Sequence, residues 1–175
     1  GGMDPGSLYN DIYEKDITLS IGKYLEKYLS EMGATVIMTR TSDSDLSNGA
    51  RNHRKKVDFD ERIKIINQKI VDMYLSIHLN YLTDTRYYGA QVFYNKNNEE
   101  LAKSIQEYLN NNTNTNREVK KIPTSTYMYD KLNTNGVLVE CGFLSNATER
   151  SKLVTKEYQS KFAKILAQAI SHYYN

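Results

Sequence analysis

The sequence predicts an α/β domain in which a mostly parallel, twisted sheet is flanked by helices. Two apolar runs, residues 71–80 and 136–146, have the composition of buried strands, and each ends in turn-forming residues. Helical patterns, with apolar residues every three or four positions, alternate with these strands along the chain. Strands interleaved with helices in this way are typical of a single α/β domain with a largely parallel sheet.

The first half of the chain begins with a predicted helix over residues 14–32, whose apolar residues fall on one face and which Gly33 ends as a C-terminal cap. A strand over residues 35–39 is expected to follow. Residues 41–56 are polar and rich in turn formers, so we expect them to be irregular. A second amphipathic helix over residues 57–70 then leads into the first apolar run.

In the second half, the polar, low-complexity residues 110–116 are expected to form a surface loop. A short helix should follow the second apolar run, with Asn146 and Glu149 capping it reciprocally. The remaining elements predicted from apolar spacing are a strand over residues 89–94, a helix over 97–109 and a final helix over 156–173.

The composition fits one globular domain spanning residues 1–175. The chain is 39% hydrophobic and 25% charged, which is enough for a real core. Its net charge of +2 gives no indication of a nucleic-acid partner. Cys141 is the sole cysteine, which excludes an intrachain disulfide and a thiolate cluster for zinc. No apolar run approaches the roughly 20 residues that a transmembrane helix needs.

Two side chains with metal-binding or acid–base chemistry lie in the apolar runs, His78 in the first and Glu140 in the second. If the two strands are parallel neighbours, both side chains share the edge at which open α/β sheets build their sites. A helix that follows a strand begins at the strand's carboxyl end, so Glu14, which opens the first helix, belongs to the same edge. Catalytic zinc uses three imidazole or carboxylate ligands, while a further carboxylate moves protons. One histidine and two glutamates are one ligand short of that set.

Each of the three residues also has a purely structural interpretation. His78 could be a hydrogen-bonded polar group at a strand end. Glu14 could simply stabilise the N-terminus of its helix through the helix dipole. Glu140 follows an apolar strand, where a structural carboxylate would need a cationic partner that the neighbouring sequence does not supply. A hydrolytic metal centre is therefore the favoured interpretation of the three together.

The order and spacing of several short segments resemble those of the zinc-dependent N-acetylmuramoyl-L-alanine amidases (amidase type 3 family), which cut bacterial cell-wall peptidoglycan. The segments are Gly1-Gly2-Met3-Asp4-Pro5-Gly6, Glu14, residues 76–80 and residues 140–146. The resemblance covers essentially the whole chain. Within the family it is nearest to the germination-type, spore-cortex amidases, because of the run at residues 90–94 and the basic insert before Asp58.

The resemblance implies a Zn²⁺ ion held by two histidines and one glutamate, with a second glutamate as the catalytic residue. On this chain, His78 and Glu14 are the implied zinc ligands and Glu140 is the implied catalytic residue. The family's other histidine directly precedes the two glycines with which this sequence begins. That ligand, and the first strand that carries it, are therefore expected to be missing from an N-terminally truncated domain.

The reaction implied by the resemblance is hydrolysis of the amide bond between the lactyl group of N-acetylmuramic acid and the L-alanine of the stem peptide. Its partners would be peptidoglycan glycan strands and stem peptides. A regulatory protein is a further candidate partner. Its location would be outside the cytoplasm, in the cell wall or spore cortex. Two alternatives stay open: a catalytically silent cell-wall binding or partner-recognition module, and a zinc peptidase that cuts within the stem peptide.

Three further residues are candidates for supporting or substrate-binding roles. Asn80 follows His78 closely and either orients that histidine's loop or is a simple turn residue. Arg54 and Lys55 belong to the basic run of residues 51–56, which is either a solvated surface loop or a contact for stem-peptide carboxylates.

Overall fold

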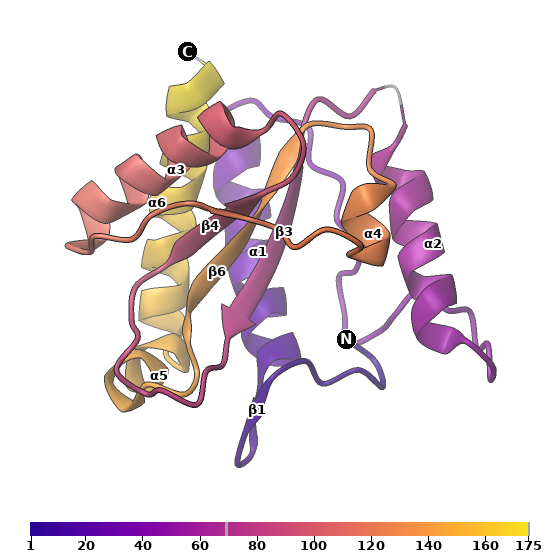
Figure 1. The fold of residues 1–175 in the computed structure, drawn as a ribbon, viewed down its shortest axis with the longest axis horizontal. Helices are drawn as coiled ribbons and strands as arrows, with labels where there is room; N and C mark the ends of the chain where they lie inside the picture. The colour runs from indigo at the N-terminus through magenta and orange to yellow at the C-terminus, as the bar shows by residue number, and fades with distance from the viewer. Residues whose placement is uncertain (69, 175) are drawn as a thin grey trace.

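A four-stranded mixed sheet forms the centre of the computed structural model, which describes residues 1–68 and 70–174 (Figure 1). Its strands lie in the order β3-β6-β4-β5. β3 and β6 are parallel, as are β4 and β5, whereas β4 and β6 are antiparallel. The strand bounds are Tyr74–Asn80 for β3, Gln91–Tyr94 for β4, Lys120–Lys121 for β5 and Gly136–Phe143 for β6. The predicted α/β fold is confirmed, and two of these three strand pairs are parallel.

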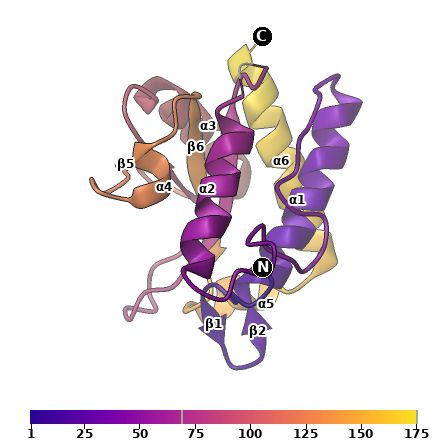
Figure 2. The same cartoon turned by 90° about the vertical axis from the view of Figure 1, so that its right-hand side faces the viewer.

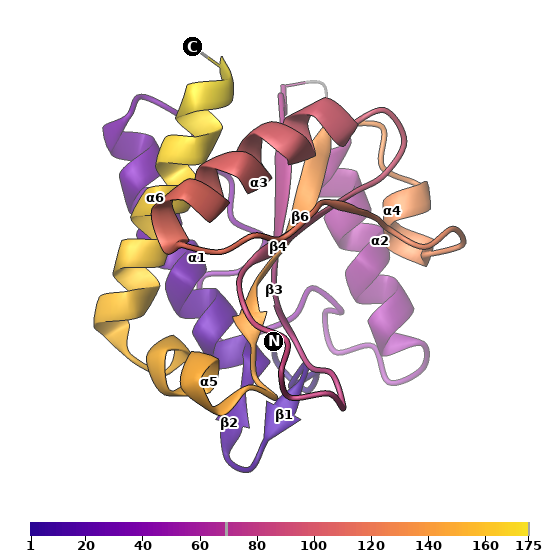
Figure 3. The same cartoon turned by 60° about the vertical axis from the view of Figure 1, so that its left-hand side comes forward.

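Helices cover both faces of the sheet. Helices α1, α3 and α6 pack on one face, and α2 and α4 pack on the other (Figures 1 and 2). The short α5 and the hairpin of β1 and β2 lie at the end of the sheet where β3 and β6 finish (Figure 3). The bounds of these elements are Leu8–Tyr9 for β1, Ile12–Tyr13 for β2, Glu14–Glu31 for α1, Arg54–Ile66 for α2, Glu99–Thr113 for α3, Tyr127–Asp130 for α4, Ala147–Leu153 for α5 and Lys156–Tyr174 for α6.

The alternation of side chains along β6 separates two apolar clusters. Val137, Val139 and Cys141 point into the larger cluster, which they share with α1, α3 and α6. Leu138 points the other way, into a smaller cluster with α2 and α4. Glu140 lies two residues after Leu138 in the strand, so its side chain points to the same face, that of the smaller cluster. Cys141 is fully buried on the opposite face.

Helix α1 forms where its apolar spacing predicts it. Ile17, Ile21 and Leu25 are buried along one face, against the larger cluster. Gly33 ends the helix with a φ of +93°, a conformation that glycine adopts without strain. Because α1 begins at the end of the sheet where β3 and β6 finish, it delivers Glu14 there (Figure 1). The final helix also matches its predicted range to within one residue.

The predicted strand over residues 35–39 is wrong. The segment is irregular, and Ile37 is 50% exposed. A strand needs a neighbour to satisfy its backbone groups, and the part of the chain that the structure describes places no strand beside this segment. Apolar alternation alone was therefore not enough to form it.

Helix α2 begins three residues before the predicted range of 57–70 and also ends earlier. His53 has a left-handed φ of 52°, and its carbonyl accepts the amide of Val57 at 3.0 Å, so the first turn starts at Arg54. At the other end, the hydroxyl of Thr134 donates to the carbonyl of Ile66 at 2.6 Å. Residue 69 of the predicted range lies outside the described residues.

The polar run 110–116, which was predicted as a loop, is helical as far as Thr113. The Asn112 amide donates to the carbonyl of Tyr108 at 2.8 Å, and the Thr113 hydroxyl donates to that of Leu109 at 2.7 Å. These local bonds stabilise the last turn of α3 although its residues are poor helix formers. Asn114 then ends the helix with a left-handed φ of 54°.

The cap of α5 is only half of the predicted one. Asn146 accepts the amide of Glu149 at 3.0 Å, as expected. The Glu149 carboxylate does not return the bond and instead accepts the amide of Gly89 at 2.9 Å. It thereby ties α5 to the segment that leads into β4. None of the described helices is long and apolar enough to cross a membrane.

Candidate active site

Glu14, His78 and Glu140 meet at the end of the sheet where β3 and β6 finish. His78 and Glu140 are direct partners in the parallel register of β3 and β6, so their side chains lie next to each other on one face. Glu14 reaches this point from the first turn of α1, and its Oε1 lies 2.9 Å from Nδ1 of His78. Residues that are distant in the sequence thus form one cluster of an imidazole and two carboxylates.

The carboxylate of Glu14 is buried and tightly bonded. Its Oε2 accepts the amide of Ser7 at 2.6 Å, and its Oε1 accepts the amide of Leu79 at 3.1 Å. Gly6 passes so close that a Cβ there would lie 2.6 Å from Oε2. Burial by itself would raise the pKa of Glu14, but the bonds with His78 and the two amides outweigh it and hold that pKa below its ordinary value. The Glu14 carboxylate is therefore held in place in its ionised form.

The imidazole of His78 is held from both sides. An ionised carboxylate only accepts hydrogen bonds, so Nδ1 donates to Glu14. Its Nε2 lies 3.1 Å from Oγ of Ser76, and that hydroxyl lies 2.8 Å from the phenol oxygen of the buried Tyr129 in α4. Burial would lower the pKa of His78, but the bond with Glu14 and the charge of Glu140 raise it above its ordinary value. The ring orientation is thus fixed by hydrogen bonds to Glu14 and Ser76, and Tyr129 holds Ser76 in turn.

Glu140 differs from Glu14 because part of its carboxylate has no partner. Its Oε2 is sealed from solvent and forms no hydrogen bond within the described residues. Burial raises the pKa of Glu140 to about 7, the Glu14 carboxylate adds to the rise, and His78 opposes it. A carboxylate with a pKa near neutrality gives and takes protons readily at physiological pH. A structural carboxylate would instead be paired.

The atoms of this cluster, an imidazole nitrogen and carboxylate oxygens, are of the kinds that zinc binds. Two ligands of one tetrahedral zinc lie roughly 3.3 Å apart, and the Glu14 and His78 donor atoms are 2.9 Å apart. A small outward movement would therefore admit the ion. Within residues 1–68 and 70–174, however, no group of three or more histidine, cysteine, aspartate or glutamate side chains has the geometry to hold a metal. Glu14 and His78 are therefore two candidate ligands, one fewer than catalytic zinc uses.

Of the other three predicted residues, two are engaged in ion pairs. Arg54 forms an ion pair with Asp45, and Lys55 pairs with Asp4 at 3.2 Å. Asn80 uses its backbone carbonyl to accept the amide of Leu144 at 2.8 Å, next to an irregularity in the β3–β6 register. Their predicted roles toward a substrate stay predictions.

Ser76, Tyr129, Gln91 and Arg117 were missed by the sequence analysis, although all of them lie on the face of the site. Ser76 could have been found from the sequence. It lies two residues before His78 in the same strand, so the two side chains point to the same face of the sheet. The other three come from α4, β4 and the segment before β5, and only the tertiary fold brings them there.

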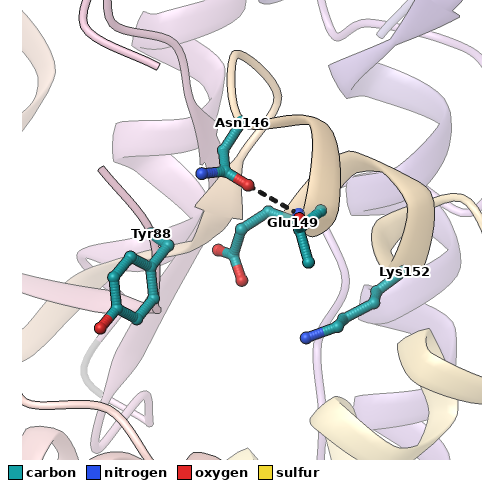
Figure 4. Close-up of a pocket in the computed structure, with 5 residues that line it drawn as sticks. Tyr88, Asn146, Glu149 and Lys152 are labelled. Atoms are coloured by element: carbon teal, nitrogen blue, oxygen red, sulfur yellow. Dashed lines mark hydrogen bonds between the residues drawn. The ribbon is translucent and has the colours of Figure 1, made fainter. Parts of the chain in front are cut away.

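A separate pocket of about 220 Å³ lies beside α5 and does not include the cluster. Figure 4 shows Tyr88 on one side of it and Lys152 on the other, with the Glu149 carboxylate between them. Asn146 caps α5 at its rim, and Thr148 completes the lining. The pocket is small and open, and its carboxylate is already bonded to Gly89.

The fold and the cluster together define an α/β enzyme of the hydrolase class, and comparison with known proteins gives its family. The family model for N-acetylmuramoyl-L-alanine amidase matches residues 1–172. The germination-specific N-acetylmuramoyl-L-alanine amidase of Bacillus subtilis (strain 168) is 40% identical over 181 residues, covering 99% of this chain and 76% of that protein.

Solved structures agree with the sequence matches. The CwlD amidase from Clostridioides difficile, in complex with the GerS lipoprotein, has a TM-score of 0.91 at 38% sequence identity. The match covers 99% of this chain and 93% of the CwlD chain. The N-acetylmuramoyl-L-alanine amidase from Clostridium difficile 630 has a TM-score of 0.84 at 26% sequence identity. That match covers 99% of this chain and 91% of the other. This chain belongs to the N-acetylmuramoyl-L-alanine amidase family and acts on peptidoglycan.

Proposed function

We propose that the chain hydrolyses the bond between the lactyl group of N-acetylmuramic acid and L-alanine in a zinc-dependent reaction, with Glu14 and His78 as zinc ligands and Glu140 as the catalytic residue. The observation that supports this most is the unpartnered Oε2 of Glu140 beside the Glu14–His78 pair. An unpaired buried carboxylate costs stability, so a reacting group is the better explanation for it.

Zinc, when bound, would lower the pKa of a water molecule toward about 7 and polarise the scissile carbonyl. Glu14 and His78 would hold it, and the family resemblance supplies a histidine as the third ligand. The amides of Ser7 and Leu79 would keep the Glu14 carboxylate in place. Ser76 and Tyr129 would keep the imidazole of His78 turned toward Glu14.

Glu140 would move the proton. Ionised Glu140 takes a proton from the attacking water, and protonated Glu140 then delivers it to the departing nitrogen of L-alanine. A pKa of about 7 suits both steps, because neither protonation state is strongly disfavoured near neutral pH. The products are a glycan with a free lactyl carboxylate and a stem peptide with a free amino terminus.

Mass spectrometry of muropeptides digested by the purified protein tests this function. Cleavage by an amidase releases peptides that begin with L-alanine, whereas a peptidase acting within the stem leaves that alanine on the sugar. We expect Glu140→Gln to reduce cleavage by about 10²- to 10⁴-fold. Glu107→Gln makes the same chemical change on the exposed surface of α3 and should have no effect. Full activity of Glu140→Gln, or unchanged muropeptides with the wild type, would refute the proposal.

We also propose that the protein acts outside the cytoplasm, on the cell wall or the spore cortex, and that its activity is under the control of a protein partner. The Bacillus subtilis relative is named for germination, and the Clostridioides difficile structure contains a lipoprotein bound to the amidase. Fractionation of sporulating cells tests the location. Amidase activity measured before and after addition of the co-purifying proteins tests the control.

A further inference from the structure

A row of polar side chains continues from Glu140 across the sheet. Gln91 of β4 is the direct register partner of Glu140 on the antiparallel side, so the two side chains lie on the same face. Gln91 is almost fully buried and its Oε1 accepts a hydrogen bond from Nη2 of Arg117 at 2.6 Å. The row thus leads from the acid–base residue to a guanidinium.

Arg117 is held rigidly in this position. Its guanidinium lies 5.6 Å from the ring centre of Tyr87 and 5.3 Å from that of Phe143. Its backbone amide donates to Oδ1 of Asn110 at 3.1 Å, and its carbonyl accepts from the same side chain at 2.8 Å. Gln91, in turn, is fixed by donating to the carbonyl of Glu118 at 2.7 Å. A planar cation is therefore preorganised before any ligand arrives.

This cation has no anionic partner in the part of the chain that the structure describes. Arg117 forms no ion pair there, although ten other pairs form elsewhere in the described residues. Its Nε is buried without a hydrogen-bond partner, and the only other buried side-chain atom in that condition among the described residues is Oε2 of Glu140. Both unsatisfied atoms thus belong to the same row, and the charge of Arg117 is left without a carboxylate partner within the described residues.

The spacing of the row selects the part of the substrate that would reach Arg117. The guanidinium of Arg117 lies over the ring of Phe143, which follows Glu140 by three residues in β6, and at about 3.3 Å per residue this places it roughly 10 Å from Glu140. An extended peptide advances about 3.3–3.6 Å per residue, so the Cα of the second stem residue lies roughly 7 Å from the scissile carbonyl and its carboxylate lies further along. In a stem whose second residue is γ-linked glutamate, that carboxylate is free.

We propose that Arg117, oriented by Gln91, binds the free α-carboxylate of the second residue of the stem peptide. This inference rests on the proposed amidase function, because that function places the scissile bond at Glu140 and lets the stem peptide extend from there toward Arg117. An arginine fork suits a carboxylate, which accepts two parallel N–H bonds. The enzyme would therefore discriminate stems with a free carboxylate at this position from stems in which it is amidated.

The test compares kcat/KM on two muropeptides that differ only in this group, with either an α-carboxylate or a carboxamide on the second residue. The wild type should prefer the carboxylate by about 10- to 100-fold, the range of a charge-assisted hydrogen bond. Arg117→Met should reduce the ratio to near one, and Arg117→Lys should give an intermediate ratio. Arg86→Met is the matched control, because Arg86 is exposed on the same loop as Tyr87 and is paired with Asp84. It should leave the ratio unchanged.

Two results would overturn the subsite. One is a wild-type ratio near one, which would leave the amidase function intact. The other is an equal loss on both substrates in Arg117→Met, which would indicate a packing role for the cation between Tyr87 and Phe143. Binding of the free dipeptide acid and its amide, measured by calorimetry on folded variants, decides the subsite even if neither muropeptide is cleaved. Absence of cleavage of both muropeptides would contradict the proposed amidase function. Tighter binding of the dipeptide acid than of its amide, lost in Arg117→Met, would still support the subsite.

Discussion

The two glutamates of the site show how environment shifts the pKa of one kind of side chain in opposite directions. Glu14 accepts two backbone amides and the imidazole of His78, which favours its ionised form. Glu140 is buried with one oxygen unpartnered, which favours its protonated form. A fixed anion suits a metal ligand and a carboxyl that titrates near neutrality suits proton transfer, so the structure supports the roles proposed for them.

Glu140 should make the stability of the metal-free protein depend on pH. Its pKa in the folded protein, about 7, is higher than its unfolded value. Its contribution to the free energy of unfolding is therefore fully present below the unfolded pKa and is lost as pH rises through about 7. With a chelator present, we expect the wild type to lose about 3 kcal/mol from this residue between pH 4 and pH 9. Thermal unfolding across that range should show a smaller loss for Glu140→Gln, and parallel curves would contradict the assignment.

Ser76 and Tyr129 should act through His78. A hydroxyl both donates and accepts hydrogen bonds. The Ser76 hydroxyl can therefore accept a hydrogen bond from Nε2–H, while it donates to Tyr129, when Nδ1 must be free for a metal. We expect Ser76→Ala and Tyr129→Phe to weaken zinc binding by about 10- to 100-fold. Tyr127→Phe is the control, since its hydroxyl in the same helix bonds to Asp60 instead. Zinc affinities measured with a competing chelator check this, and equal affinities in all variants would contradict it.

At the scale of elements, the turn before the β1–β2 hairpin fixes the position of Glu14. Gly6 has a φ of +68°, and a Cβ there would meet Oε2 of Glu14 at 2.6 Å. We expect Gly6→Ala to destabilise the protein by about 1–3 kcal/mol and to weaken zinc binding. Gly49→Ala separates the two causes, because Gly49 has a φ of +78° but nothing within 4 Å of the added carbon. Chemical denaturation and zinc titration of both variants measure this. Unchanged zinc binding in folded Gly6→Ala would contradict it.

Elements with strong apolar periodicity were predictable, and elements that depend on partners were not. The bounds of α1 and α6 followed from spacing and capping residues alone. The strand expected at residues 35–39 failed because a strand forms only beside another strand. The end of α3 was missed because side-chain bonds within its last turn outweighed the low helix propensity of asparagine and threonine.

The same distinction holds within the site. His78 and Glu140 stood out because ionisable side chains are rare in apolar strands. Glu14 was assigned to the same edge because its helix starts there, and the structure brings all three together. Arg117 had no local signal, because it lies in an irregular polar segment. Its role depends on contacts with residues 26 positions away or more, such as Gln91 and Phe143.

At the scale of the whole molecule, the sheet separates stability from chemistry. The larger apolar cluster, with α1, α3 and α6, lies behind the sheet, while the site and the smaller cluster lie in front of it. Within the described residues, the two buried side-chain atoms that lack a hydrogen bond, in Glu140 and Arg117, lie on the face of the site, and the larger core on the other face stabilises the fold that holds them. This arrangement explains how a chain of 175 residues retains an unpartnered carboxylate.

The central claim is that Glu14 and His78 are ligands of one zinc ion and that Glu140 transfers the proton in the reaction. Zinc content per chain, measured by mass spectrometry on the purified wild type and on Glu14→Ala, His78→Ala and Glu140→Gln, tests it most directly. The account predicts one zinc in the wild type and in the inactive Glu140→Gln, and little or none in the other two. Full zinc content in Glu14→Ala and His78→Ala would contradict it.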